Sequence, residues 1–70
     1  MIREGSKVVI MASLRLKEMR LYGLIDYTGT VTEDLNYNGR KNKGYMVHFN
    51  EPYLGDYLWF VPFESVKNAE

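Results

Sequence analysis

The chain of 70 residues contains no cysteine, a single histidine and two prolines. The absence of cysteine excludes disulfides, thiolate metal sites and a cysteine nucleophile, so the fold must be held together by packing alone. The apolar run from Val8 to Ala12 is far too short to span a bilayer, and the first six residues are too few and too polar for a signal peptide. We therefore expect an intracellular, cytoplasmic protein that makes no contact with a membrane.

Length and charge limit what the chain can be. We expect one domain over residues 1–70, and a domain this small buries only about 60% of the surface of its unfolded chain, which leaves little room for a deep pocket. The formal net charge is zero, which argues against a dedicated, strong nucleic-acid binder. Residues 1–43 carry eight basic and five acidic side chains, whereas residues 44–70 carry one and four, so the surface can be dipolar.

Three stretches of the sequence predict strands: "SKVVIMA", the stretch from Gly29 to Asn50, and the run from Tyr57 to Val61. The first is "SKVVIMA", in which Val8, Ile10 and Ala12 share one face. Next, a strand that opens at Gly29 and the segment "GYMVHFN" flank a turn around Asn38-Gly39, a pair that tolerates positive φ. This second stretch predicts a β-hairpin.

The two later strands differ in how polar their faces are. In the returning strand of the hairpin, alternation separates an apolar face from a mixed one; the first is Tyr45, Val47 and Phe49, and the second is Met46, His48 and Asn50. Between Tyr57 and Val61, after the turn at Pro52 and Gly55, both faces are apolar. Such a strand must be covered on both sides, or else it presents aromatic surface to a partner.

The segment from Ser13 to Asp26 fits two structures. Apolar residues alternate about a Lys17-Glu18 tip, which favours a bent hairpin; they are Leu14, Leu16, Met19 and Leu21. The alternative is a short helix capped by Ser13. It would align Leu14, Leu21 and Ile25 but scatter Leu16, Met19 and Leu24, and Gly23 would weaken it by about 1 kcal/mol. We prefer the hairpin.

These segments together predict an all-β fold, a small and partly open SH3-like barrel of five short strands with a long bent excursion after the first strand. The segment Val61-Pro62-Phe63-Glu64-Ser65-Val66 resembles the end of SH3 domains, where an apolar residue and a proline lead into a 3₁₀ turn and a valine begins the last strand. Ser65 stands where SH3 domains carry the tyrosine of their proline-peptide groove, and their paired tryptophans are missing.

A second resemblance covers more of the chain. Three segments, "REGSKV", "GTV" and "YMVHF", resemble strands that occur in the same order in the SH3-like stromal subunit of photosystem I and in the variable chain of ferredoxin-thioredoxin reductase. Those proteins act by docking other proteins. The resemblance implies an SH3-like fold, and it carries fold much better than function.

The sequence offers little material for catalysis. His48 is the only histidine, and we find no glycine-rich phosphate loop, no nucleophile elbow and no metal-ligand spacing. Glu33 and Asp34 are neighbours on a predicted strand, so their carboxylates point to opposite faces and do not converge. We therefore expect a protein that is not an enzyme and that uses neither a cofactor nor a metal.

The aromatic residues are the strongest functional signal. Six tyrosines and one tryptophan exceed what so small a core can bury, and tyrosine combines apolar contact with a polar group, as binding surfaces require. We expect Tyr45 to be buried. The predicted function is non-catalytic binding of another protein or peptide, either on an aromatic centre with a charged rim or by strand addition at the open barrel edge. The predicted binding residues are Tyr22, Tyr27, Tyr53, Tyr57 and Trp59.

Two further hypotheses remain open. Basic residues in the long excursion and in the "NGRKNKG" loop would form a nucleic-acid surface if these two loops lie side by side, with phosphates on the cations and bases on a ring. The residues of this alternative are Arg15, Lys17, Arg20, Tyr37, Arg40, Lys41 and Lys43. The other hypothesis is a homodimer in which the strands with two apolar faces cover each other.

Overall fold

The computed structural model describes residues 2–69 and consists mainly of β-strands. In chain order the elements are β1 (Lys7–Ile10), α1 (Leu14–Glu18), the 3₁₀ helix η1 (Tyr22–Leu24), β2 (Thr28–Asp34), β3 (Gly44–Tyr53), β4 (Asp56–Pro62), the 3₁₀ helix η2 (Phe63–Ser65) and β5 (Val66–Asn68). The expected five short strands are all present, and the chain is all-β as predicted.

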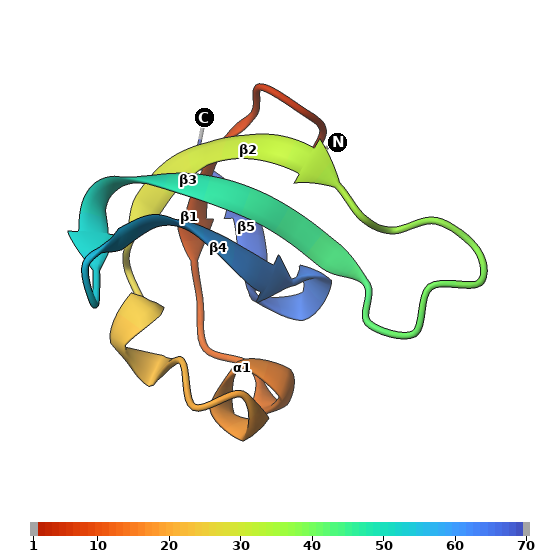
Figure 1. Cartoon of the computed structure of the whole chain (residues 1–70), viewed down its shortest axis with the longest axis horizontal. Coiled ribbons are helices and arrows are strands. Elements are labelled where there is room, and N and C mark those ends of the chain that lie inside the picture. Colours follow the sequence, from red (N-terminus) through yellow and green to blue (C-terminus); the bar gives the residue numbers. More distant parts are fainter. Residues whose placement is uncertain (1, 70) are drawn as a thin grey trace.

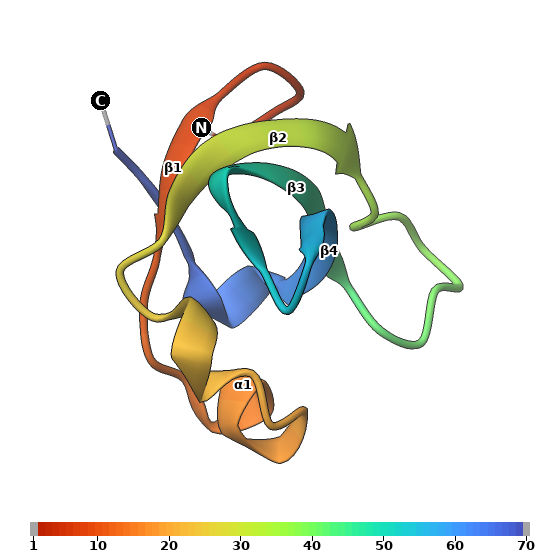
Figure 2. The same cartoon turned by 60° about the vertical axis from the view of Figure 1, so that its left-hand side comes forward.

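The five strands form one antiparallel sheet in the order β4-β3-β2-β1-β5. The sheet curls into an open, barrel-like shell, and α1 and η1 lie together at one end of it (Figures 1 and 2). Because β4 and β5 are the outermost strands of the sheet, each has one edge that no other strand of the described chain covers.

The core fills the inside of the curled sheet. It contains one or more apolar side chains from each of β1 to β5, and the excursion adds three leucines that close the end of the shell. Its buried members are Val8, Ile10, Leu16, Leu21, Leu24, Val31, Val47, Phe49, Val61 and Val66. Half-buried rings, including Tyr45, pack against this cluster, so Tyr45 is less deeply buried than expected.

The predicted hairpin is confirmed by the pairing of β2 with β3, in which Gly29 lies opposite Phe49. A β-bulge interrupts the register between Val31 and Glu33, which increases the local bend of the sheet. In the connecting loop, Gly39 has φ 88°, the left-handed conformation that the Asn-Gly pair predicts. Along β3 the residues Val47 and Phe49 face the core, as their alternation indicates.

The preferred prediction for residues 13–26 is wrong, because this segment contains two short helices instead of a hairpin. Ser13 caps α1: it has an extended backbone and its Oγ accepts a hydrogen bond from the Leu16 amide. The helix ends at once because Arg20 adopts φ 59°, a left-handed conformation. A five-residue helix is too short to display a helical repeat, so alternating leucines resemble a strand at this length.

Hydrogen bonds hold the excursion against the sheet at both of its ends. Where it begins, the Met11 amide donates to the Ser65 carbonyl at 2.8 Å, and the hydroxyls of Ser13 and Ser65 lie 2.5 Å apart. Where it ends, the Asp26 amide donates to the Ile10 carbonyl and the Ile10 amide donates to the Tyr27 carbonyl. The excursion is therefore a fixed part of the fold and can position a site.

Close approach of β3 to β4 depends on Gly44. A Cβ atom at this position would overlap the Val61 carbonyl oxygen and lie 2.9 Å from the Pro62 Cα. Because both neighbours are backbone atoms, no side-chain rotation can make room, so only glycine fits there. This contact brings together the two strands that carry Tyr53, Tyr57 and Trp59.

Candidate functional site

Three of the five predicted protein-binding residues pack into an aromatic cluster at one end of the shell. Tyr27 meets Phe49 edge to face at 5.5 Å and Tyr53 at 5.8 Å, and Tyr53 meets Trp59 at 5.4 Å. The Trp59 indole N–H donates to the Asp56 carbonyl at 2.9 Å. Tyr27, Tyr53 and Trp59 are each half-buried against the core, so much of their apolar surface already stabilises the fold.

The other two predicted residues, Tyr22 and Tyr57, lie on different surfaces. Tyr22 begins η1, and 52% of its surface is exposed. Tyr57 lies near the start of β4, and its ring stacks on the His48 ring with the centroids 5.4 Å apart and the planes 7° from parallel. The structure therefore does not bring the five residues together as one aromatic centre.

An open apolar groove of about 380 Å³ lies at the excursion, and Tyr22 is one of its walls. It is lined by Ala12, Ser13, Leu14, Leu16, Lys17, Tyr22 and Ile25. Leu16 is fully buried, whereas Leu14 is 73% and Ile25 36% exposed. Sequence reasoning missed Leu14 and Ile25 as site residues because their exposure follows from the early end of α1, which no sequence pattern shows.

The polar groups of this groove are few and differ in availability. The Ser13 hydroxyl already bonds to Ser65 and to the Leu16 amide. Lys17, by contrast, is exposed, and within residues 2–69 it forms no ion pair. The groove can therefore accept an apolar side chain, and Lys17 supplies a positive charge for a carboxylate beside it.

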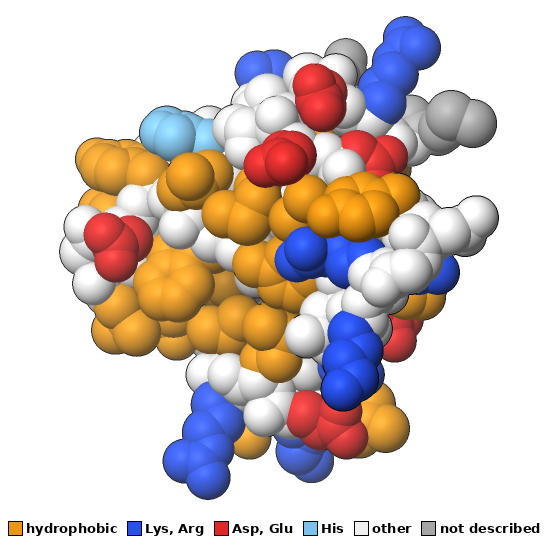
Figure 3. Space-filling model, turned by 45° about the vertical axis from the view of Figure 1, so that its right-hand side comes forward, with side chains coloured by type: hydrophobic (Ala, Val, Ile, Leu, Met, Phe, Trp, Pro, Cys, Tyr) orange, Lys and Arg blue, Asp and Glu red, His pale blue; other side chains and the backbone are white. Residues whose placement is uncertain are grey.

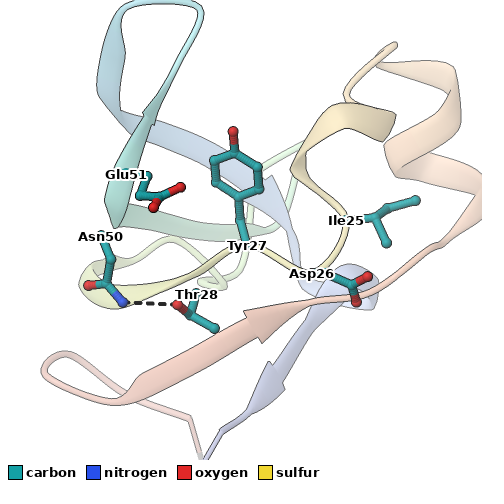
Figure 4. Close-up of a pocket in the computed structure, with 6 residues that line it drawn as sticks. All are labelled: Ile25, Asp26, Tyr27, Thr28, Asn50 and Glu51. Carbon is teal, nitrogen blue, oxygen red and sulfur yellow. Dashed lines mark hydrogen bonds between the residues drawn. The ribbon is translucent and has the colours of Figure 1, made fainter.

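A second hollow, of about 400 Å³, is polar and lies where β2 begins (Figure 4). In this view the Asn50 amide and the Thr28 hydroxyl point toward each other and are joined by a 2.9 Å hydrogen bond. The carboxylates of Asp26 and Glu51 lie on opposite sides of the Tyr27 ring and do not converge. Within the described residues, no group of three or more potential ligand side chains could hold a metal ion.

The two basic segments lie side by side, which is the condition for the nucleic-acid hypothesis. Arg15 Nη2 on α1 donates to Asn42 Oδ1 in the β2–β3 loop at 2.8 Å. In the same loop the Arg40 guanidinium lies 5.5 Å from the centre of the Phe60 ring and 5.9 Å from that of Tyr37. The other cations of this set are exposed; they are Lys17, Arg20, Lys41 and Lys43.

The outer side of β4 carries a continuous apolar surface. Figure 3 shows hydrophobic side chains gathered over the face that holds β4, with both acidic and basic side chains around the margin. Tyr57 and Leu58 are 47% and 49% exposed, and Phe60 is half-buried. The sequence left two alternatives for this strand, cover on both sides or an exposed apolar surface, and the exposure of Tyr57 and Leu58 agrees with the second. Leu58 and Phe60 were nevertheless not predicted as site residues, because the prediction considered only tyrosine and tryptophan as binding side chains.

One titratable group has a shifted pKa. Burial raises the pKa of the Tyr45 hydroxyl above its ordinary value, and the negative charge of Asp34 acts in the same direction. A hydrogen bond with the Asn36 side chain acts against these two effects. Tyr45 pairs with Val61 across β3 and β4 and packs on the core, so this shift belongs to the fold and not to a binding surface.

Comparison of the chain with protein-family models, with curated proteins and with solved structures gives no match in any of the three. Among the described residues, no helix has the length and apolar character needed to cross a membrane. The candidate surfaces are therefore judged on their geometry: an apolar groove at the excursion, an apolar strand edge at β4, and a basic surface between α1 and the β2–β3 loop.

Proposed function

We propose that the protein is a non-catalytic binding module that docks another protein by taking one of its apolar side chains into the groove between α1 and η1. The observation that carries the proposal is that this groove has apolar walls, is open to the surface and is built on a segment held at both ends. Apolar pockets with few polar groups are the usual sites for such anchor residues.

The groove also indicates what its partner contains. Among the residues that line the groove, Lys17 carries the one charge. An acidic residue beside the apolar anchor of the partner would therefore complement Lys17. The order of the strands and the 3₁₀ turn after Pro62 support the SH3-like resemblance, which stays a proposal together with the docking role that it implies. A groove at the excursion makes no use of Ser65, where SH3 domains carry their groove tyrosine.

The test uses linear peptides selected from a random displayed library against the immobilised protein. We expect the selected peptides to share a large apolar residue next to Asp or Glu. Tyr22→Ala should weaken the binding of the tightest peptide about tenfold or more, because it removes one wall of the pocket. Tyr37→Ala is the matched control, since Tyr37 is 58% exposed but lies in the β2–β3 loop. Equal losses from the two variants would contradict the proposal.

A second candidate function, nucleic-acid binding, is favoured by the hydrogen bond between Arg15 and Asn42, which joins the two basic segments. Fluorescence titration with a single-stranded oligonucleotide should then show binding that falls steeply as salt rises, because the basic side chains of the protein displace the counterions condensed on the phosphates. Arg40→Gln should weaken this binding more than Arg3→Gln, which removes an exposed charge that precedes β1. Absence of binding at low salt would remove this candidate.

A further inference from the structure

The two edges of the sheet differ in how they are protected against pairing with another strand. At one edge, β5 is only three residues long and carries Lys67, and both features discourage the addition of a further strand. At the other edge, β4 runs for seven residues; its charged residue, Asp56, and its proline, Pro62, stand at the two ends, and the apolar run between them has neither. In Figure 1 this strand lies across the front of the molecule. A long apolar edge without these protective features is unusual in a monomeric protein.

The hydrogen-bond pattern shows which backbone groups of β4 point away from β3. The Phe63 amide donates to the Lys43 carbonyl, and alternation along an antiparallel pair then makes Tyr45–Val61 and Val47–Trp59 the hydrogen-bonded pairs. The N–H and C=O groups of Leu58 and Phe60 consequently point outward from the sheet edge. These outward groups are the ones to which an added strand binds.

The apolar and charged side chains along β4 are arranged asymmetrically. Asp56 stands at its first residue, whereas Arg15 and Arg40 lie near its last residues, since Arg40 covers Phe60 and Arg15 binds the loop that precedes β3. In an antiparallel pair, the start of an added strand lies beside the end of β4. The best partner strand therefore begins with an acidic residue and continues with apolar ones.

The strand β4 itself has this pattern, because Asp56 is followed by an apolar run from Tyr57 to Val61. We propose that a second copy of this chain pairs with β4 through its own β4, antiparallel, about a two-fold axis at Trp59. Leu58 of each copy then lies opposite Phe60 of the other, and each such pair exchanges both of its main-chain hydrogen bonds. Asp56 of each copy comes next to the basic end of the other strand.

This pairing brings the apolar surfaces of the two β4 strands side by side. Leu58 and Phe60 lie on the outer face of the sheet with their cross-strand neighbours His48 and Met46, so the dimer extends one apolar surface across both copies. The groove at α1 and η1 is a separate surface. The dimer proposal can therefore fail while the proposed docking function holds, and the reverse is also true.

Sedimentation velocity at concentrations from about 1 μM to about 500 μM tests the proposal, because a specific dimer of ordinary affinity forms within this range. We expect a monomer–dimer equilibrium for the wild-type chain. Leu58→Lys should shift the midpoint of this equilibrium at least tenfold toward higher concentration, because it places a charge on the edge and brings the two like charges of the paired copies close together. Met11→Lys is the matched control, with a similar exposure of 43% and a position outside β4.

Three results would overturn the proposal: a wild-type monomer at the highest concentration, an assembly larger than a dimer, or an equal shift for the two lysine variants. If Leu58→Lys does not fold, amide hydrogen exchange of the wild-type chain tests the strand pairing instead. The Leu58 and Phe60 amides should be protected at high concentration and exchange faster on dilution. Fast exchange of both amides at every concentration would contradict the two-fold pairing.

Discussion

The Tyr45 hydroxyl lies where burial opposes its ionisation, and its raised pKa gives a pH dependence that can be measured. A folded-state pKa above the unfolded value means that the folded chain holds this proton more tightly. The resulting stability is fully present below the unfolded pKa of about 10 and is lost as the pH rises through the folded pKa. The free energy of unfolding should therefore fall at alkaline pH.

Urea unfolding between about pH 8 and about pH 12 checks this prediction in the range where tyrosine ionises. The wild-type chain should lose more stability across this range than Tyr45→Phe, which has no hydroxyl to ionise. Tyr37→Phe removes the hydroxyl of an exposed ring and should follow the wild-type curve. Parallel curves for the wild type and Tyr45→Phe would show that Tyr45 does not contribute.

At the scale of single residues, the sequence predicted that many aromatic side chains are exposed, but it did not predict which of them contact one another. Tyr22, Tyr37 and Tyr57 are exposed, as a count of rings against core volume indicates. That count cannot show that Tyr53 and Trp59 stack edge to face on each other at the end of the shell. Such contacts depend on the pairing of distant strands, and no local pattern records them.

At the scale of elements, the contact between the excursion and η2 depends on two serines. Ser65 is fully buried, and its hydroxyl bonds to that of Ser13, which also caps α1. We expect Ser65→Ala to lower the free energy of unfolding by about 1 to 2 kcal/mol, because it breaks a buried hydrogen bond and leaves Ser13 with one partner fewer.

A double-mutant cycle with Ser13→Ala measures this contact by urea unfolding. The two substitutions together should cost less than the sum of their separate effects, by about 0.5 to 1.5 kcal/mol. Ser6→Ala is the control, because the Ser6 hydroxyl makes its hydrogen bond, with the Arg3 amide, near the surface. Additive effects of the Ser13 and Ser65 substitutions would contradict the account of this contact.

The strands were predictable from sequence and the excursion was not, for a physical reason. Strands β1 to β4 show alternation or turn residues that act locally, such as the Asn38-Gly39 pair before β3. The end of α1 depends on a left-handed Arg20, and the position of α1 depends on a hydrogen bond to Ser65, 52 residues away from Ser13. Contacts of this range leave no periodic signal in the chain.

For the whole molecule, we propose separate roles for separate surfaces. In our proposals the groove at α1 and η1 takes a partner's apolar side chain, and the β4 edge pairs with a second copy. Both roles follow from the same property, a small curled sheet that lacks the volume to bury all of its apolar side chains. The basic surface at Arg15 and Arg40 supports the competing nucleic-acid function.

Chemical-shift mapping of the isotope-labelled chain during titration with the tightest selected peptide tests the central claim most directly, because it compares every surface in one experiment. The account predicts that the largest shifts fall on groove residues, above all Leu14, Lys17, Tyr22 and Ile25. Shifts that are confined to β4 or to the loop around Arg40, with the groove unchanged, would contradict it.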